Sequence, residues 1–125
     1  MAVLDASAVL ALLNNEPGAA KVAAALNGAS ISAVNLAEVA AKLSDYGMGE
    51  TDIENALGSL SLQIVPLDEA GAYASAALRQ ATRRAGLSLG DRCCLVLGQS
   101  HGEGVLTADR AWTRLGLTIA ITAIR

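Results

Sequence analysis

The feature that most constrains the fold is an alternation of short apolar segments with longer segments of helical periodicity. The short segments are rich in Val, Ile and Leu, as buried strands are. Residues 34–46 repeat apolar side chains every three or four positions, which predicts a helix. Strands that alternate with helices throughout predict an α/β three-layer sandwich, with a mainly parallel central sheet flanked by helices. The expected strands lie in residues 2–5, 29–32, 62–68, 104–109 and 117–124.

The segments between these strands carry ordinary helix signals. Pro17 suits the first turn of a helix, and Gly28 suits its end. The chain has 125 residues, of which 53% are hydrophobic, and it contains no internal repeat or linker. These features predict a single domain spanning residues 1–125. The expected helices lie in residues 6–15, 16–28, 34–46, 49–60, 69–86, 88–101 and 110–116.

The composition argues against several classes of protein. The sequence starts without a basic segment and has no apolar run of about 18 residues, so we expect no signal peptide, no membrane span and a cytoplasmic location. Cys93 and Cys94 are adjacent and have no other cysteine to pair with, which predicts buried free thiols. A single histidine, His101, supplies neither a zinc site nor a catalytic triad.

The basic residues are concentrated in the last third or so of the chain, although the formal net charge is −3. An acidic balance argues against a long basic groove for nucleic acid. Two interpretations of these basic residues remain. They are ordinary solvated charges on helix surfaces, or their guanidinium groups bind phosphate groups. The seven arginines are Arg79, Arg83, Arg84, Arg92, Arg110, Arg114 and Arg125.

Four acidic residues stand where a strand or loop passes into a helix. The carboxyl ends of parallel strands lie along one edge of a sheet, where ligands bind in open α/β folds, so these side chains can converge. Each also has a structural explanation as a helix cap, and "SLGD" at 88–91 has the form of a capping box. Capping alone does not explain why all four are acidic. The residues are Asp5, Glu38, Asp91 and Asp109.

Four carboxylates that lie close together repel one another unless cations offset their charge. A hard, all-oxygen ligand set without histidine or thiolate favours Mg²⁺ or Mn²⁺ over zinc or copper. Such an ion orients a phosphate and lowers the pKa of a bound water. Hydrolysis of a phosphodiester bond is therefore the leading reaction class.

The segments "VLDASAVLALL", "NLAE", "GLSLGDRCCLVLG" and "VLTADRAW" together resemble the PIN-domain ribonucleases, and among them the VapC toxins of bacterial toxin–antitoxin pairs. The resemblance covers essentially the whole chain. It implies an endoribonuclease that uses one or two Mg²⁺ or Mn²⁺ ions, held by Asp5, Glu38, Asp91 and Asp109. It also implies supporting polar positions at Ser7, Asn35 and Thr107, each of which has a capping alternative.

The resemblance further implies an RNA substrate, a small antitoxin that covers the acidic pocket, and a homodimer. Some relatives carry a further acid shortly after the last aspartate, where this chain has Trp112, so the number of metal ions stays open. Arg92 and Arg110 follow two of the acids and either pair with a carboxylate or reach phosphate.

Other functions stay open as well. A PIN nuclease of RNA processing and a catalytically silent PIN-fold binding module are the alternatives. A third alternative is a phosphotransferase that uses Asp5 as its nucleophile. Such enzymes carry a second aspartate two residues further on, where this chain has Ser7.

Overall fold

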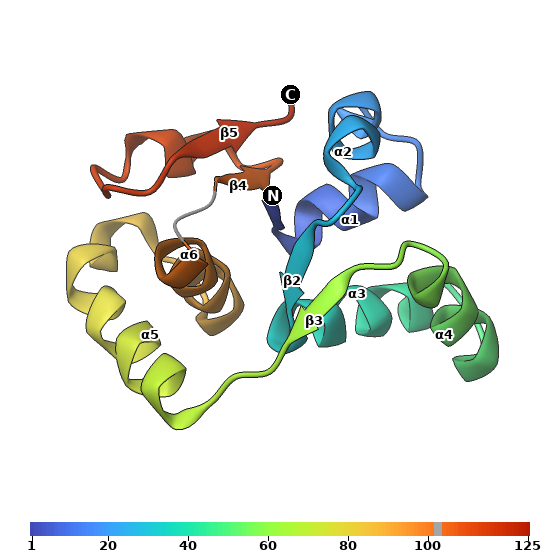
Figure 1. The fold of residues 1–125 in the computed structure, drawn as a ribbon, viewed down its shortest axis with the longest axis horizontal. Coiled ribbons are helices and arrows are strands. Elements are labelled where there is room, and N and C mark those ends of the chain that lie inside the picture. The colour runs from blue at the N-terminus through green and yellow to red at the C-terminus, as the bar shows by residue number, and fades with distance from the viewer. Residues whose placement is uncertain (102–103) are drawn as a thin grey trace.

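A computed structural model of the chain describes residues 1–101 and 104–125. Five short strands form one sheet in the order β3-β2-β1-β4-β5, and every neighbouring pair is parallel (Figure 1). This order is doubly wound, because the chain moves from β1 toward one edge and then returns to place β4 on the other side of β1. The strands are β1 (Val3–Leu4), β2 (Ser30–Ser32), β3 (Gln63–Val65), β4 (Val105–Thr107) and β5 (Ile121–Ala123).

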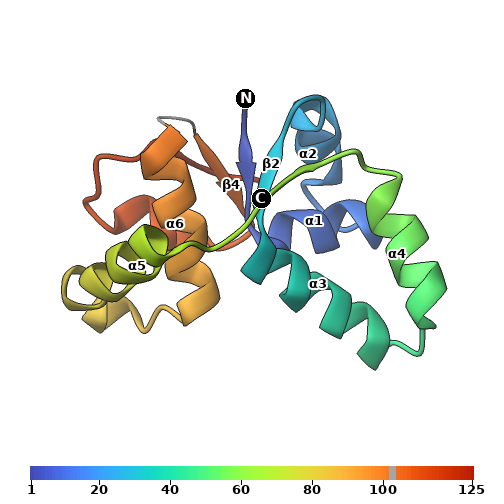
Figure 2. The same ribbon diagram turned by 60° about the horizontal axis from the view of Figure 1, so that its bottom comes forward.

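Helices cover both faces of the sheet, as the sequence predicts (Figure 2). The first four helices share one hydrophobic core, and the last two share another on the opposite face. The first group is α1 (Ala6–Leu13), α2 (Ala19–Ala25), α3 (Ala33–Asp45) and α4 (Glu50–Gly58), and the second is α5 (Glu69–Ala81) and α6 (Leu89–His101). The predicted α/β three-layer sandwich is therefore confirmed.

The central strand β1 divides the two cores. Val3 packs with α6 and β4, whereas Leu4 packs with α1 and α3. Both side chains are fully buried. Successive residues of a strand point to opposite faces, so a strand of two residues is enough to contribute to both cores.

Several predicted helices differ from the structure in detail. The expected helix 16–28 is shorter, Ala19–Ala25, so the prediction that Pro17 stands in its first turn is wrong, and Gly28 lies beyond its end. The expected helix 69–86 ends at Ala81 and continues as a 3₁₀ turn, Arg83–Ala85. The buried hydroxyl of Thr82 donates a hydrogen bond to the Leu78 carbonyl oxygen at 2.7 Å, which closes the α-helix there. The expected helix 110–116 is a 3₁₀ helix, Arg110–Arg114.

The carboxyl-terminal residues pack against the loop before α2. Gly18 has a φ of 95°, and a Cβ at this position would lie 2.6 Å from the Ile124 carbonyl oxygen. The Arg125 Nη1 atom pairs with Glu16 Oε1 at 3.0 Å. These contacts join the strand β5 to the segment between α1 and α2.

Cys93 and Cys94 are buried free thiols, as predicted. Among the residues that the structure describes, no helix has both the length and the apolar character needed to cross a membrane.

Candidate functional site

The candidate site lies at the carboxyl edge of the sheet, where β1 and β4 end side by side. Leu4 is in register with Leu106, and the backbone N–H of Asp5 donates to the Leu106 carbonyl oxygen at 3.0 Å. Asp5 therefore leaves β1 beside Thr107, the last residue of β4. This is the point at which the direction of the strand order reverses, where ligands bind in doubly wound sheets.

Two hydroxyl groups hold the carboxylate of Asp5. Ser7 Oγ donates to Asp5 Oδ2 at 2.6 Å, and Thr107 Oγ1 donates to the same oxygen at 3.0 Å. The backbone N–H of Ala108 donates to Ser7 Oγ at 2.9 Å, so Ser7 also joins α1 to the end of β4. Asp5 is only 5% exposed. Ser7 and Thr107 thus both lie directly against the first acid, Asp5.

Asn35 holds the second acid. Its side chain is fully buried, and its Nδ2 donates both to Glu38 Oε1 at 2.8 Å and to the Gly90 carbonyl oxygen at 2.9 Å. The amide therefore links the first turn of α3 to the first turn of α6. This double contact gives Asn35 a specific role in orienting Glu38.

Gly90 is a residue that the sequence interpretation missed. A Cβ at this position would overlap the carboxylate of Glu38, so only glycine leaves room for Glu38 in its present orientation. A signal was available in the sequence, because glycine inside a helix costs about 1 kcal/mol relative to alanine and calls for a packing reason.

Asp91 takes part in the predicted capping box at the start of α6. The Ser88 N–H donates to Asp91 Oδ2 at 2.9 Å, and the Asp91 N–H donates to Ser88 Oγ at 3.1 Å. Capping therefore fixes the side chain of Asp91 at the helix N-terminus, where the helix dipole favours a negative charge. Asp91 is half-buried, so its carboxylate is also partly accessible to a ligand.

The charge of Asp91 acts on the carboxylates of Asp5 and Glu38, and the charge of Asp5 also acts on Glu38. Burial raises the pKa of Asp5, the hydrogen bonds from Ser7 and Thr107 lower it, and the charge of Asp91 raises it. Partial desolvation raises the pKa of Glu38, the Asn35 hydrogen bond lowers it, and the charges of Asp5 and Asp91 raise it. These three predicted site residues are therefore brought together by the fold.

The same three charges reach the thiol of Cys94. Burial, followed by the charges of Asp5, Asp91 and Glu38, raises the pKa of Cys94 well above its ordinary value. Cys94 is therefore a buried neutral thiol close to the acidic cluster.

Asp109 is placed differently. Its Oδ1 accepts a hydrogen bond from the Ala111 N–H at 3.0 Å and so caps the 3₁₀ helix, as the capping alternative predicts. Its backbone N–H donates to Thr107 Oγ1 at 3.1 Å. Its carboxylate is exposed and is not among the charges that shift the pKa of Asp5 or Glu38. Asp109 therefore borders the site through Thr107, and its role as a metal ligand stays a prediction.

Arg92 does not offset the acidic charge. It is 8% exposed, and its Nη1 donates to the Ser75 carbonyl oxygen of α5 at 2.9 Å. It forms no ion pair with a carboxylate in the described part of the chain, and its burial keeps it from reaching phosphate. The expected pairing of Arg92 with a carboxylate is therefore not found among the described residues: Arg92 joins α6 to α5.

The donor set fits a hard divalent cation. The clustered side chains present carboxylate oxygens only, with raised pKa values that a bound Mg²⁺ or Mn²⁺ would lower. Within residues 1–101 and 104–125, however, no three acidic, histidine or cysteine side chains already form a closed set of metal ligands. The structure therefore shows neighbouring carboxylates with the right chemistry rather than a preformed coordination sphere.

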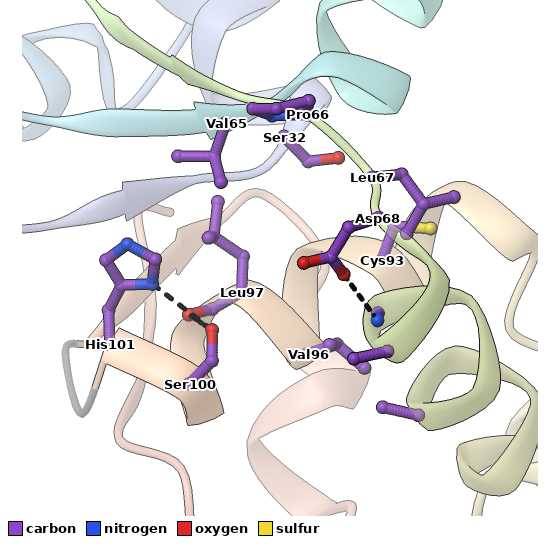
Figure 3. Close-up of a pocket in the computed structure, with 13 residues that line it drawn as sticks. Ser32, Val65, Pro66, Leu67, Asp68, Cys93, Val96, Leu97, Ser100 and His101 are labelled. Atoms are coloured by element: carbon purple, nitrogen blue, oxygen red, sulfur yellow. Dashed lines mark hydrogen bonds between the residues drawn. The ribbon is translucent and has the colours of Figure 1, made fainter.

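A separate pocket of about 330 Å³ opens between the β3–α5 connection and α6 (Figure 3). Its walls include Val65, Leu67 and Leu97. Among the described residues that line it, Asp68 supplies the one carboxylate, and this side chain caps α5 by accepting from the Gly71 N–H at 2.7 Å. The four predicted acids do not line this pocket, so it is distinct from the acidic site.

The doubly wound parallel sheet and the carboxylates at its carboxyl edge define an α/β protein with an acidic cluster at the switch point of its sheet. The sequence model of the PIN domain matches residues 2–117, and the chain belongs to this family. PIN domains are generally nucleases. No curated protein sequence matches the chain.

Solved structures share the fold over nearly the whole chain. A toxin–antitoxin complex from Klebsiella pneumoniae matches with a TM-score of 0.80 and 21% identity, covering 100% of this chain and 98% of that one. VapBC2 from Rickettsia felis, bound to a DNA fragment from its promoter, matches with a TM-score of 0.76 and 15% identity, covering 98% and 97%. FitAcB from Neisseria gonorrhoeae matches with a TM-score of 0.70 and 22% identity, covering 99% and 98%.

Proposed function

We propose that the protein is a Mg²⁺- or Mn²⁺-dependent endoribonuclease that hydrolyses RNA phosphodiester bonds and acts as the toxin of a toxin–antitoxin pair. The observation that carries this proposal is the convergence of Asp5, Glu38 and Asp91 at the carboxyl edge of the sheet, where the charge of Asp91 acts on Asp5 and the charges of both act on Glu38, in a chain of the PIN family. Neighbouring carboxylates whose charges repel are suited to a site that is completed by a cation.

The residues of the site have separate roles in this proposal. Asp5, Glu38 and Asp91 hold one or two ions, and Asp109 supplies a fourth carboxylate from the end of β4. A divalent ion bound there stabilises negative charge on the phosphate and favours deprotonation of the attacking water. Ser7 and Thr107 fix Asp5 Oδ2, whereas Asn35 fixes Glu38 Oε1. These hydrogen bonds keep the carboxylates oriented before RNA arrives.

The toxin role rests on the kind of complexes that share the fold. The Klebsiella pneumoniae structure is a toxin–antitoxin complex, and VapBC-5 from Mycobacterium tuberculosis belongs to the same kind of system, with a TM-score of 0.57 and 22% identity. We accordingly propose a cognate antitoxin as the partner, a homodimer as the assembly and the cytoplasm as the place of action.

RNA cleavage by the purified protein tests the enzymatic part. We expect cleavage with Mg²⁺ or Mn²⁺, and loss of cleavage in excess EDTA or in Asp5→Asn and Asp91→Asn. Asp52→Asn, an exposed acid in the first turn of α4, is the matched control and should cleave normally. Full cleavage by Asp5→Asn, or by the wild type in EDTA, would contradict the proposal.

Induced expression in a bacterial host separates the toxin from the alternatives. We expect growth arrest by the wild type and none by Asp5→Asn at equal protein level. Cleavage in the test tube without growth arrest would instead identify a stand-alone PIN nuclease of RNA processing. A folded wild type with neither activity would identify a silent PIN-fold module.

A further inference from the structure

A small basic pocket lies at the end of α5, outside the acidic site. It has a volume of about 250 Å³. Arg79 comes from the last turn of α5, and Arg83 from the 3₁₀ turn that follows. The residues that line the pocket are Arg79, Thr82, Arg83, Gly86 and Leu87.

The segment around this pocket is basic in an acidic protein. Residues 70–90 contain three arginines and no acidic residue, whereas the whole chain has a net charge of −3. Arg79 and Arg83 are exposed, and neither forms an ion pair in the portion of the chain that the structure describes. Their guanidinium groups are therefore available to an anionic ligand.

Stabilisation of the helix end does not require these two side chains. Basic residues near a helix C-terminus interact favourably with its dipole, which explains why they are tolerated. The end of α5 is nevertheless closed by other groups. The Thr82 N–H and hydroxyl both donate to the Leu78 carbonyl oxygen, and the Gly86 N–H donates to the Arg83 carbonyl oxygen at 3.2 Å. The guanidinium N–H groups of Arg79 and Arg83 therefore remain available to bind a ligand.

The pocket lies next to the acidic site along the chain. Leu87, which lines the pocket, directly precedes Ser88, whose N–H and hydroxyl fix Asp91. Consecutive Cα atoms are about 3.8 Å apart. Gly86, with a φ of 66°, turns the chain from the 3₁₀ segment toward α6. The backbone of an RNA strand bound at the acidic site can therefore continue over the pocket.

We propose that Arg79 and Arg83 bind a backbone phosphate of the RNA strand beside the phosphodiester bond to be cleaved. The inference rests on the proposed function and adds a substrate-binding site to it. The guanidinium fork matches the geometry of phosphate oxygens. Contacts to phosphate fix the register of a nucleic acid and carry no base specificity.

The test measures RNA binding and cleavage separately. Binding of a fluorescein-labelled single-stranded RNA is followed in the Asp5→Asn background, where cleavage does not deplete the probe. We expect Arg79→Gln combined with Arg83→Gln to weaken binding about tenfold and to reduce the salt dependence of log K by about 0.7, which is the contribution of one phosphate contact on a single strand. In the otherwise wild-type enzyme, KM should rise by a similar factor with kcat nearly unchanged.

Arg84→Gln is the matched control. It removes the same charge from the same 3₁₀ turn, but Arg84 does not line the pocket. It should leave both the affinity and the salt dependence nearly unchanged. Arg79→Lys combined with Arg83→Lys should keep the salt dependence and lose only part of the affinity, because charge remains and the fork is lost.

Two results would overturn the inference. One is unchanged RNA affinity and salt dependence in the double glutamine variant with an unchanged thermal midpoint. The other is an equal loss in Arg84→Gln, which would indicate diffuse attraction rather than a site. In both cases the wild-type protein would still cleave RNA. If the proposed function is wrong, the wild-type protein would not cleave RNA at all.

Discussion

The carboxylate of Glu38 lies over Gly90, in the space that a Cβ at position 90 would occupy. Asn35 reinforces this contact, because its Nδ2 binds both the Glu38 carboxylate and the Gly90 carbonyl oxygen. These contacts therefore hold the N-terminal ends of α3 and α6 together. Since Asp91 follows Gly90 directly, this contact sets the relative position of two of the acids.

Gly90→Ala should separate activity from stability. The new methyl group displaces the carboxylate of Glu38, which is the flexible end of an exposed side chain, so the fold adapts easily. Displacing a catalytic group by about 1 Å costs up to about a hundredfold in rate, and we expect a loss of ten- to a hundredfold in kcat/KM. Helix propensity favours alanine, so the thermal midpoint should stay equal or rise.

The matched control for this variant is Gly58→Ala, at the end of α4, where a Cβ meets no atom within 4 Å. It should leave cleavage unchanged. Normal kcat/KM in Gly90→Ala would show that the orientation of Glu38 set by Gly90 is unimportant for activity.

Asp5→Asn should stabilise the protein at neutral pH. The raised pKa of Asp5 means that the folded chain binds this proton more tightly than the unfolded chain does. The ionised carboxylate therefore destabilises the fold above its folded-state pKa. This cost disappears as the pH falls below the ordinary value of 3.8. Asparagine removes the cost, and we expect the thermal midpoint in metal-free buffer to rise by about 3 °C at pH 7.

The pH dependence is the decisive measurement for Asp5→Asn. Its advantage over the wild type should shrink as unfolding is followed down toward pH 4, an acidity at which an ordinary Asp side chain is about half protonated. A gain of the same size at every pH would point to improved packing rather than to a removed charge.

Mg²⁺ or Mn²⁺ should stabilise the folded wild type. Binding to the folded state adds about 2.7 kcal/mol at a hundredfold excess over Kd, which raises the thermal midpoint by several degrees. The rise should be absent or much smaller in Asp5→Asn and Asp91→Asn. NaCl at matched ionic strength serves as the control for screening. An equal rise in wild type and both variants would contradict binding at these carboxylates.

Gly18→Ala should destabilise the fold strongly, because the methyl group meets the backbone and side chain of Ile124. Gly47 shares the φ of 95°, but a Cβ at this position would meet no atom within 4 Å, so Gly47→Ala isolates the cost of the backbone conformation. We expect a loss of about 1 kcal/mol for Gly47→Ala and at least about 2 kcal/mol for Gly18→Ala in urea unfolding. Equal losses would show that contact with Ile124 contributes nothing.

Much of the fold followed from the sequence. The repeat of apolar residues predicted α3 as 34–46, against Ala33–Asp45 in the structure, and the alternation of strands and helices predicted the parallel sheet. The capping box of Ser88 and Asp91 was also readable, because both residues lie within one helical turn. These features depend on neighbours in the chain and on the period of each element, which the sequence contains directly.

Contacts between elements were decided by the tertiary structure. The burial of Arg92 against Ser75 and the contact between Glu38 and Gly90 have no local sequence pattern. Each depends on how closely two helices approach and on which strands are neighbours. By itself, the sequence determined which acids stand at the junctions of strands and helices. Only the packing of α3 and α6 against β1 decided which carboxylates come close enough for the charge of one to raise the pKa of another.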